Sequence, residues 1–388
     1  MTKLSKSLFW SGLCLALVSV FLVLVFSPRT AAAEPDEITA SDNLIKNIRL
    51  DPDNPNFVRV GQNVTVDFDY QTVEAGGVRI FIRPFSDGAL SPGSSAHASP
   101  LHPTGSGSGS GFFRINSGNV VVDQIRLQMF NADLSELLFE TFLPVHFAFT
   151  NADDPVYNVA FSPATPNILR NNDQVDITFD YITDEPGGVR IFTLPFTDGE
   201  PTPHYAVNGS PVYPAPSGSG TGFFRITTGD VIVDQLRVRM TNADQSILLF
   251  EEFLPVHYDV AAGTHRVYNL ELTPQTPNVL DLGENVDLTF DYSTSMIGGV
   301  RIYARPMKDG DLAPGYSAHS SGIYPVGSGS GSGFFTINVD PLVVDAIRIR
   351  MTNSDDTLLL QETMLPVHYQ FGWLESGYRI YLPVVMAP

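Results

Sequence analysis

The sequence predicts an all-β protein with three tandem antiparallel β-sandwich domains that follow an N-terminal apolar segment. The first observation is an internal repeat: the pair Phe112-Phe113 recurs at 223 and at 334, a spacing of 111 residues both times. The second is period-two alternation of apolar and polar residues, which indicates half-buried strands. The third is the density of Gly, Pro and Asp turns without any amphipathic helical pattern. A period this long indicates an array of whole domains rather than a solenoid of small repeats.

Polar spacers that recur once per period set the predicted domain boundaries. They lie at 150–154 and 261–265. Because these linkers are only a few residues long, we expect the domains to form a stiff row and not loosely tethered beads. The predicted organisation is 1–33 signal peptide or membrane anchor, 39–149 repeat 1, 150–260 repeat 2, 261–371 repeat 3 and 372–388 C-terminal tail.

The N-terminal segment predicts export. Lys3 and Lys6 precede an apolar run over residues 8–26, and the alanines at 31–33 are small residues that a signal peptidase accepts. The run is close to the ~20 residues that span a bilayer, so an uncleaved anchor is the alternative. Both alternatives predict an extracellular or cell-surface location. The only cysteine, Cys14, lies in this run, so no disulfide is expected in the repeats.

The charge balance excludes one class of partner. The chain has 42 acidic and 22 basic side chains and a formal net charge of −20. Such a surface repels phosphate backbones and anionic lipid. We therefore expect no nucleic-acid binding, and membrane contact only through residues 8–26 if they are retained.

The strands of each repeat are expected in the same order. In repeat 1, a short strand that ends in a proline turn precedes the strand 64–70, in which four apolar residues alternate with polar ones. This alternation is typical of a half-buried antiparallel strand. Gly76-Gly77 then leads into a strand over 78–85, which Asp87-Gly88 closes with a tight turn. A proline-rich excursion over 89–104 follows, and the last strands are expected at 121–129 and 137–149.

Glycine and serine alternate over Gly105–Gly111. The phase does not fit a G-x-S-x-G nucleophile elbow, so we predict no catalytic serine. Glycine at every second position leaves one face of a strand without side chains. We expect an edge strand or flexible loop whose bare face lets another backbone or an aromatic ring approach, with a shallow glycan groove as the alternative.

Six or seven short strands in about a hundred residues, joined by Gly, Pro and Asp turns, resemble the immunoglobulin-like and fibronectin type III class of extracellular modules. The resemblance covers all three repeats and implies two-sheet sandwiches outside the cell, as in tandem bacterial modules of this kind. It is one of pattern, since the Cys, Trp, Cys signature of true immunoglobulin domains is absent.

One acid and one base recur in every repeat. Asp123 shares the phase of the inward-facing Ile125, so we expect a carboxylate at the edge of the core, where it needs a partner. Arg79 is the best candidate for that partner. A structural ion pair or backbone capping is favoured over catalysis. The predicted pairs are Asp123–Arg79, Asp234–Arg190 and Asp345–Arg301.

A metal site is not expected from the recurring histidines. His146, His257 and His368 fall out of phase with the inward residues of the last strand, which predicts a surface position. A zinc site needs three or four ligands close together, and one histidine per domain does not supply them.

Structural calcium is the one cofactor that the recurring acids suggest. Asp69, Asp180 and Asp291 recur and could bind it with the acids of the turns that follow the strand 121–129 and its equivalents. Their spacing matches no EF-hand loop. We therefore expect no cofactor, with calcium as the minor alternative.

Aromatic residues of the excursion loops are the candidate ligand-binding groups. Exposed aromatics on such loops can stack against sugars, or they can tuck under the loop as a satellite cluster. The candidates are Tyr205, Tyr213, Tyr316, Tyr324 and His319.

Three near-identical copies favour reach and multivalency over catalysis, which needs one constellation of groups. We predict a secreted or cell-surface, non-enzymatic structural or adhesive protein. The alternative is a carbohydrate-binding protein whose excursion loops contact a glycan or cell-surface polymer, and an enzyme is the least favoured class. The sequence leaves the ligand and the oligomeric state open.

Overall fold

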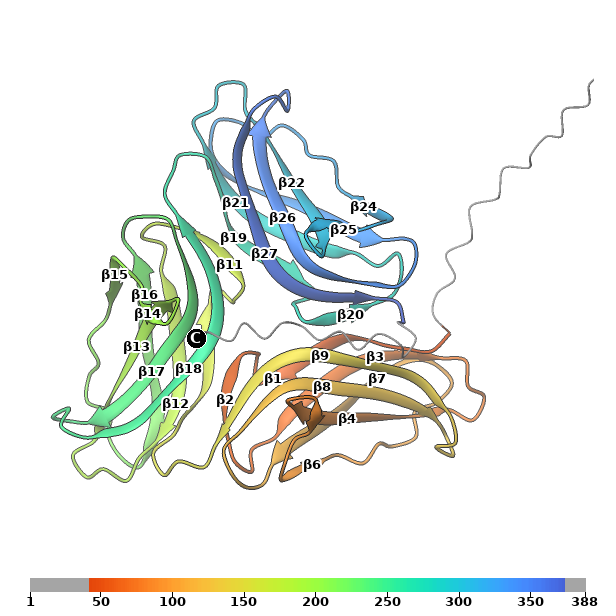
Figure 1. The fold of residues 1–388 in the computed structure, drawn as a ribbon, viewed down its shortest axis with the longest axis vertical. Helices are drawn as coiled ribbons and strands as arrows, with labels where there is room; N and C mark the ends of the chain where they lie inside the picture. Colours follow the sequence, from red (N-terminus) through yellow and green to blue (C-terminus); the bar gives the residue numbers. More distant parts are fainter. Residues whose placement is uncertain (1–41, 374–388) are drawn as a thin grey trace, which may run out of the picture. The chain divides into compact units, whose positions relative to one another are not determined.

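Each repeat folds as a four-stranded and a five-stranded sheet in the computed structural model, which describes residues 42–373 (Figure 1). The predicted all-β fold of tandem β-sandwiches is confirmed. The segments predicted as a signal or anchor and most of the predicted tail lie outside the described residues. Within residues 42–373, no helix has the length and apolar character needed to cross a membrane.

The two sheets of repeat 1 define the pattern for the others. The four-stranded sheet has the order β1 (Leu44–Asp51), β3 (Val64–Thr72), β7 (Gly105–Ile115), β6 (Ser94–Ala96). The five-stranded sheet has the order β2 (Asn56–Arg59), β9 (Leu137–Thr150), β8 (Val120–Asn131), β4 (Val78–Ser86), β5 (Ala89–Leu90). Only β2 and β9 pair in parallel among these neighbours.

Repeats 2 and 3 have the same two strand orders. In repeat 2 the sheets are β10 (Val156–Ser162), β12 (Val175–Ile182), β16 (Ser217–Ile226), β15 (Tyr205–Val207) and β11 (Asn167–Arg170), β18 (Leu248–Ala261), β17 (Val231–Asn242), β13 (Val189–Thr197), β14 (Glu200–Pro201). In repeat 3 they are β19 (Arg266–Thr273), β21 (Val286–Thr294), β25 (Gly327–Ile337), β24 (Tyr316–Ala318) and β20 (Asn278–Leu280), β27 (Leu359–Phe371), β26 (Leu342–Asn353), β22 (Val300–Lys308), β23 (Asp311–Leu312).

The apolar face of each central strand lies in the core between the two sheets. In β3, Val64, Val66, Phe68 and Tyr70 are buried, and the polar residues between them are half-buried on the other face. Burial of one large apolar side chain contributes about 1.5–3 kcal/mol, so this alternation explains why the segment forms a strand of a sandwich.

The glycines of β7 make room for aromatic rings. In the register of β3 and β7, Gly107 lies opposite Tyr70 and Gly109 opposite Phe68. A Cβ atom added to Gly109 would lie 2.6 Å from the ring of Phe68. The predicted approach of an aromatic ring to the bare face of this strand is therefore confirmed.

We expect Gly220→Ala, at the equivalent position of repeat 2, to destabilise the protein by about 1–3 kcal/mol, because a Cβ there would lie 2.4 Å from the Phe179 ring. The measurement is the free energy of unfolding in denaturant. Gly209→Ala is the control, since a Cβ at Gly209 meets nothing within 4 Å. Equal losses in the two variants would contradict this account of β16.

A β-bulge interrupts the first strand of every repeat. The pairing of β1 with β3 shifts register between Lys46 and Arg49, which leaves Asn47 and Ile48 outside the ladder. Asn47 has a φ of 53°, a left-handed conformation that asparagine tolerates better than most residues. The same bulge occurs in β10 and β19. Each bulge leaves one backbone N–H and C=O available to another partner.

A buried asparagine of the preceding repeat satisfies these backbone groups. The Nδ2 group of Asn56 donates to the carbonyl oxygen of Val159 at 2.8 Å, and the Val159 N–H donates back to Oδ1 at 2.8 Å. Asn167 makes the same two bonds with Leu270, both at 2.9 Å. Asn278 makes them with Ile48, at 3.0 and 2.8 Å. We call these contacts junctions 1–2, 2–3 and 3–1.

The apolar cores also interlock at the junctions. Phe57, which follows Asn56 in β2, belongs to the core cluster of repeat 2 and is 1 % exposed. Ile168 belongs in the same way to the core of repeat 3, and Val279 to the core of repeat 1. Each repeat therefore places one apolar side chain inside its neighbour.

The predicted stiff row is wrong, because junction 3–1 connects the last repeat to the first. In a row, Asn278 and the bulge at Ile48 would lack partners, whereas both are buried and hydrogen-bonded to each other. The short linkers limit how far apart consecutive repeats lie. They do not determine the direction in which the chain turns, so they could not predict closure.

Candidate functional site

The loop tyrosines pack against the sandwiches. The Tyr213 ring lies 5.9 Å from that of Phe179 and 5.4 Å from that of Tyr181, and its hydroxyl donates to the Thr221 carbonyl oxygen at 3.1 Å. Burial raises the pKa of Tyr213. Tyr213 is therefore packed under its loop, and the alternative of an exposed ring that stacks against a sugar does not hold for this residue.

The corresponding loop of repeat 3 is arranged similarly. Tyr324 lies 5.8 Å from Phe290 and 5.2 Å from Tyr292, measured between ring centroids. Tyr205 and Tyr316 are half-buried and pack against the cores of their repeats. Of the five predicted ligand-binding residues only His319 is exposed, over Phe334 at 5.8 Å. The structure therefore does not assemble the five into one exposed platform.

The predicted ion pair between Asp123 and Arg79 is wrong; both groups cap backbone. Arg79 donates from Nε to Ala132 O at 3.2 Å and from Nη1 to Ser99 O at 2.9 Å. Asp123 accepts from the Asp87 N–H at 2.8 Å and so closes the Asp87-Gly88 turn. Asp234, Asp345, Arg190 and Arg301 make the equivalent backbone bonds.

A second bulge explains the error. The register of β8 and β9 shifts between Val122 and Gln124, so Asp123 does not share the inward phase of Ile125. Arg79 of β4 pairs with Phe130, which lies near the opposite end of β8 from Asp123. The backbone-capping alternative is the one that the structure bears out.

The recurring histidines are less exposed than predicted. His368 is 7 % exposed, and no described residue bonds to either of its ring nitrogens. Burial lowers the pKa of both His146 and His368 to about 4. Burial also lowers the pKa of His257, opposed by the charges of Asp259 and Asp234. The surface position predicted for His368 is therefore wrong, and His146 and His257 are half-buried.

The loop between the first two strands of each repeat accounts for this burial. The N–H of His146 donates to Asn54 Oδ1 at 2.6 Å, and that of His368 donates to Thr276 Oγ1 at 2.7 Å. These acceptors belong to the proline-containing loops that precede β2 and β20. The loops therefore lie beside the outer face of the last strand, which strand periodicity alone predicts to face solvent.

The aspartates considered for calcium hold the first bulge in place. Asp69 accepts hydrogen bonds from Asn47 Nδ2 at 3.1 Å and from Ser108 Oγ at 2.8 Å. Partial burial favours the neutral form, but the bonds from Ser108 and Asn47 and the charge of Arg49 keep the pKa of Asp69 below its usual value. Asp180 and Asp291 have the equivalent asparagine and serine partners. Residues 42–373 contain no group of three or more His, Cys, Asp or Glu side chains placed to hold a metal.

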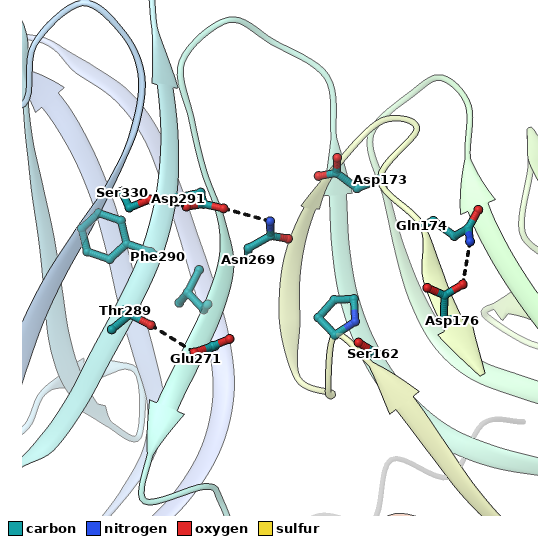
Figure 2. A pocket seen from close by; sticks show the side chains of 12 residues that line it. Ser162, Asp173, Gln174, Asp176, Asn269, Glu271, Thr289, Phe290, Asp291 and Ser330 are labelled. Atoms are coloured by element: carbon teal, nitrogen blue, oxygen red, sulfur yellow. Dashed lines mark hydrogen bonds between the residues drawn. The ribbon is translucent and has the colours of Figure 1, made fainter. Parts of the chain in front are cut away.

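A cleft of about 610 Å³ lies at junction 2–3. Figure 2 shows Asp173 and Asp176 of repeat 2 on one side, and Glu271 and Asp291 of repeat 3 on the other. Each carboxylate has a side-chain partner. Arg170 bonds to Asp173 and Gln174 to Asp176. Thr289 bonds to Glu271 and Asn269 to Asp291. These bonds organise the cleft as a polar junction surface.

A second cavity, of about 810 Å³, is lined by all three repeats. Its walls are the bulged end of the first strand and the proline loop that follows it. The lining segments are 47–50 and 53–55 in repeat 1, 160–167 in repeat 2 and 270–277 in repeat 3. Junction 3–1 brings the first and last of these segments together.

The charged contacts differ from one junction to the next. At junction 1–2, the Arg59 guanidinium lies over the Tyr157 ring at 5.4 Å, and at junction 2–3 Arg170 lies over Tyr268 at 3.8 Å. Junction 3–1 has an ion pair of Lys46 with Glu284 instead. The junctions therefore share their asparagine bonds but not their charges.

Sequence reasoning missed the junction asparagines, although they left a signal. The dipeptide Pro-Asn recurs at 55–56, 166–167 and 277–278, in phase with the repeat. It lies in a turn-like segment, where an asparagine is ordinarily assigned to turn formation. Only the structure shows that its amide lies inside the next repeat.

Asn167→Ala is expected to lower the free energy of unfolding by about 2–4 kcal/mol, because it removes two hydrogen bonds and leaves the Leu270 N–H and C=O buried without partners. Denaturant unfolding measures the loss. The exposed Asn63 takes no part in the junction bonds, and Asn63→Ala should change stability by only about 0.5 kcal/mol. A comparably small effect of Asn167→Ala would refute the importance of the junction bonds.

The chain is similar to several solved structures, each with a TM-score of 0.21. No protein-family model and no curated protein matches the chain. Among solved structures it is similar to a Salmonella alpha-2-macroglobulin mutant (11 % identity, TM-score 0.21, 86 % of this chain and 24 % of that one). It is similar to the periplasmic chaperone SfaE, with 15 % identity and a TM-score of 0.21 over 55 % of this chain and 100 % of that one. It is also similar to a marsupial T cell receptor, with 9 % identity and a TM-score of 0.21 over 82 % of this chain and 98 % of that one. The chain spans about a quarter of the macroglobulin's length.

Proposed function

We propose that this protein is a secreted or cell-surface, non-enzymatic structural and adhesive protein whose three sandwiches work as one unit. The observation that carries the proposal is the closed set of junctions. Each junction combines two hydrogen bonds to a buried asparagine with an apolar side chain placed in the next core. Three copies of one domain are thereby held in fixed relation to one another.

Fixed copies favour multivalent binding. When several sites are held at a constant spacing, the second and third contacts form at a high effective concentration and cost less conformational entropy. The recurring acids and bases support a structural role as well. Asp123, Arg79 and Asp69 each make hydrogen bonds that hold a turn or a bulge. Export is proposed from the basic and apolar pattern of the first 33 residues.

The test is a cell-binding assay with purified residues 34–388, labelled and incubated with cells of the producing organism and with unrelated cells. The proposal predicts saturable retention on the surface and no turnover of polysaccharide or peptide substrates. Asn167→Ala/Asn278→Ala should bind more weakly, because two junctions lose their hydrogen bonds. Absence of retention on every surface, or hydrolysis abolished by one carboxylate substitution, would overturn the proposal.

Carbohydrate binding is the second candidate, favoured by one observation. His319 is exposed and lies over Phe334, so an aromatic pair is accessible on the outer face of β25. Repeat 1 has the equivalent pair His97 and Phe112 at 5.3 Å. A glycan array tests this candidate: His97→Ala/His319→Ala should abolish binding, and Tyr213→Phe should not.

A further inference from the structure

Three turns meet at one end of each sandwich, which we call the turn end. In repeat 1 it consists of residues 72–77, 101–104 and 131–137. Thr104 Oγ1 donates to the Glu74 carbonyl oxygen and joins the first two segments, and Arg79, which lies just after the first segment, donates from Nε to the Ala132 carbonyl oxygen of the third. The equivalent segments of repeats 2 and 3 are 183–188, 212–215, 242–248 and 294–299, 323–326, 353–359.

Exposed apolar side chains concentrate at the turn ends. They include twelve of the nineteen large hydrophobic residues that are exposed in the described part of the chain. Ile297 is the most exposed, at 94 %. The twelve are Val73, Leu101, Leu134 and Leu137 in repeat 1, Val212, Ile247 and Leu248 in repeat 2, and Ile297, Ile323, Val326, Leu358 and Leu359 in repeat 3.

Core packing does not account for these residues. Leu101, Val212 and Ile323 occupy one position of the repeat, and each is 44–55 % exposed. Scattered single apolar residues on a surface need no explanation, whereas clusters rimmed by polar groups are typical of interaction sites. The recurrence of such a cluster at the same end of three sandwiches indicates a contact surface.

The charged residues within the turn segments all have one sign, and a base from outside them reaches the turn end of repeat 3, where Arg301 lies 3.8 Å from Asp356. The nine turn segments contain no Lys or Arg, and their acids are Glu74, Asp133, Glu136, Asp184, Glu185, Asp244, Asp355 and Asp356. Hydrogen bonds from Ser135 keep the pKa of Asp133 below its usual value, so this carboxylate is ionised at neutral pH. The nearest guanidinium in repeat 1, that of Arg79, is directed to backbone carbonyls.

We propose that the turn ends are the contact surfaces of the adhesive unit, and that their partner is a protein surface with apolar side chains flanked by Lys and Arg. This inference rests on the proposed function and names the partner class. Apolar burial supplies most of the attraction, and the acidic rim selects a basic partner and repels anionic lipid. Since the unit presents three turn ends, a partner surface that engages more than one of them retains the protein more strongly than a single contact does.

The test uses purified residues 34–388 and three immobilised synthetic peptides, one of Leu and Lys, one of Leu and Glu and one of Ser and Lys. The Leu/Lys surface should retain the protein, less strongly as salt rises, and the other two should not. Ile297→Ser/Ile323→Ser/Val326→Ser should bind at least tenfold more weakly. Leu312→Ser is the control, because Leu312 is exposed outside the turn ends.

The outcomes separate the two proposals. Unchanged unfolding midpoints are expected for both variants, since all four residues are exposed. Equal peptide binding by the triple variant and by Leu312→Ser, or equal affinity for neutral phosphatidylcholine vesicles, would overturn the inference. In the cell-binding assay, equal retention of the parent and of the triple variant would refute the role of the turn ends but support the adhesive function. If the parent is not retained, the adhesive function itself is refuted.

Discussion

Phe57→Ala is expected to destabilise repeat 2, although the residue belongs to the sequence of repeat 1. The Phe57 side chain is 1 % exposed, lies in the core cluster of repeat 2 and meets the Phe250 ring edge-to-face at 5.6 Å. Truncation of a buried phenylalanine costs about 3–5 kcal/mol, through lost transfer free energy and the cavity left behind. The loss should appear in the neighbour whose core the ring fills.

Amide hydrogen exchange read by mass spectrometry locates the effect. The Phe57→Ala protein should lose protection in β12 and β17, which line the core of repeat 2. Phe113→Ala is the matched control, because Phe113 is equally buried but lies in the core of its own repeat. Its loss of protection should fall in β3 and β8. If Phe57→Ala lowers protection only in repeat 1, the interlocked cores are refuted.

Acidification from pH 6.5 to pH 4 is expected to remove much of the stability. The pKa of His146 and of His368 is about 4 in the folded protein, against an ordinary value of 6.5. Between these values the unfolded chain binds protons that the folded chain does not, so the free energy of unfolding falls as pH falls. The lowered pKa of each histidine contributes about 3 kcal/mol to the free energy of unfolding, and this contribution is fully present above pH 6.5.

Denaturant unfolding across this pH range measures the effect. The double variant His146→Gln/His368→Gln removes both groups and should show a much flatter profile between pH 4 and pH 6.5. His319→Gln is the control, since His319 is exposed. A parent profile as flat as that of the double variant would show that the two histidines are accessible to protons in the folded protein.

The strands and the glycine face were predictable because they depend on local rules. The alternation of Val64 to Tyr70 predicts a half-buried strand, and the glycines opposite Phe68 and Tyr70 predict a close approach of rings. Neither conclusion needs knowledge of any other domain. The equal spacing of the repeats then extends both conclusions to all three.

Bulges and closure were not predictable in the same way. The bulge at Asp123 changes the phase of β8, so a strict period of two places this carboxylate in the core and leads to the wrong partner. The position of His368 depends on a loop that precedes β20, far away in the sequence. Junction 3–1 depends on contacts between Asn278 and Ile48, and no short-range pattern reports a contact over that separation.

The closed set of junctions has a consequence for chain connectivity. A linear array needs special capping units at its two ends, because the outermost units each lack a neighbour. Here every repeat has two neighbours, and the junction that no linker spans has the same asparagine bonds as the two that linkers span. The place where the polypeptide starts is therefore interchangeable in principle. We expect a circular permutant that begins with repeat 2 and ends with repeat 1 to form the same three junctions.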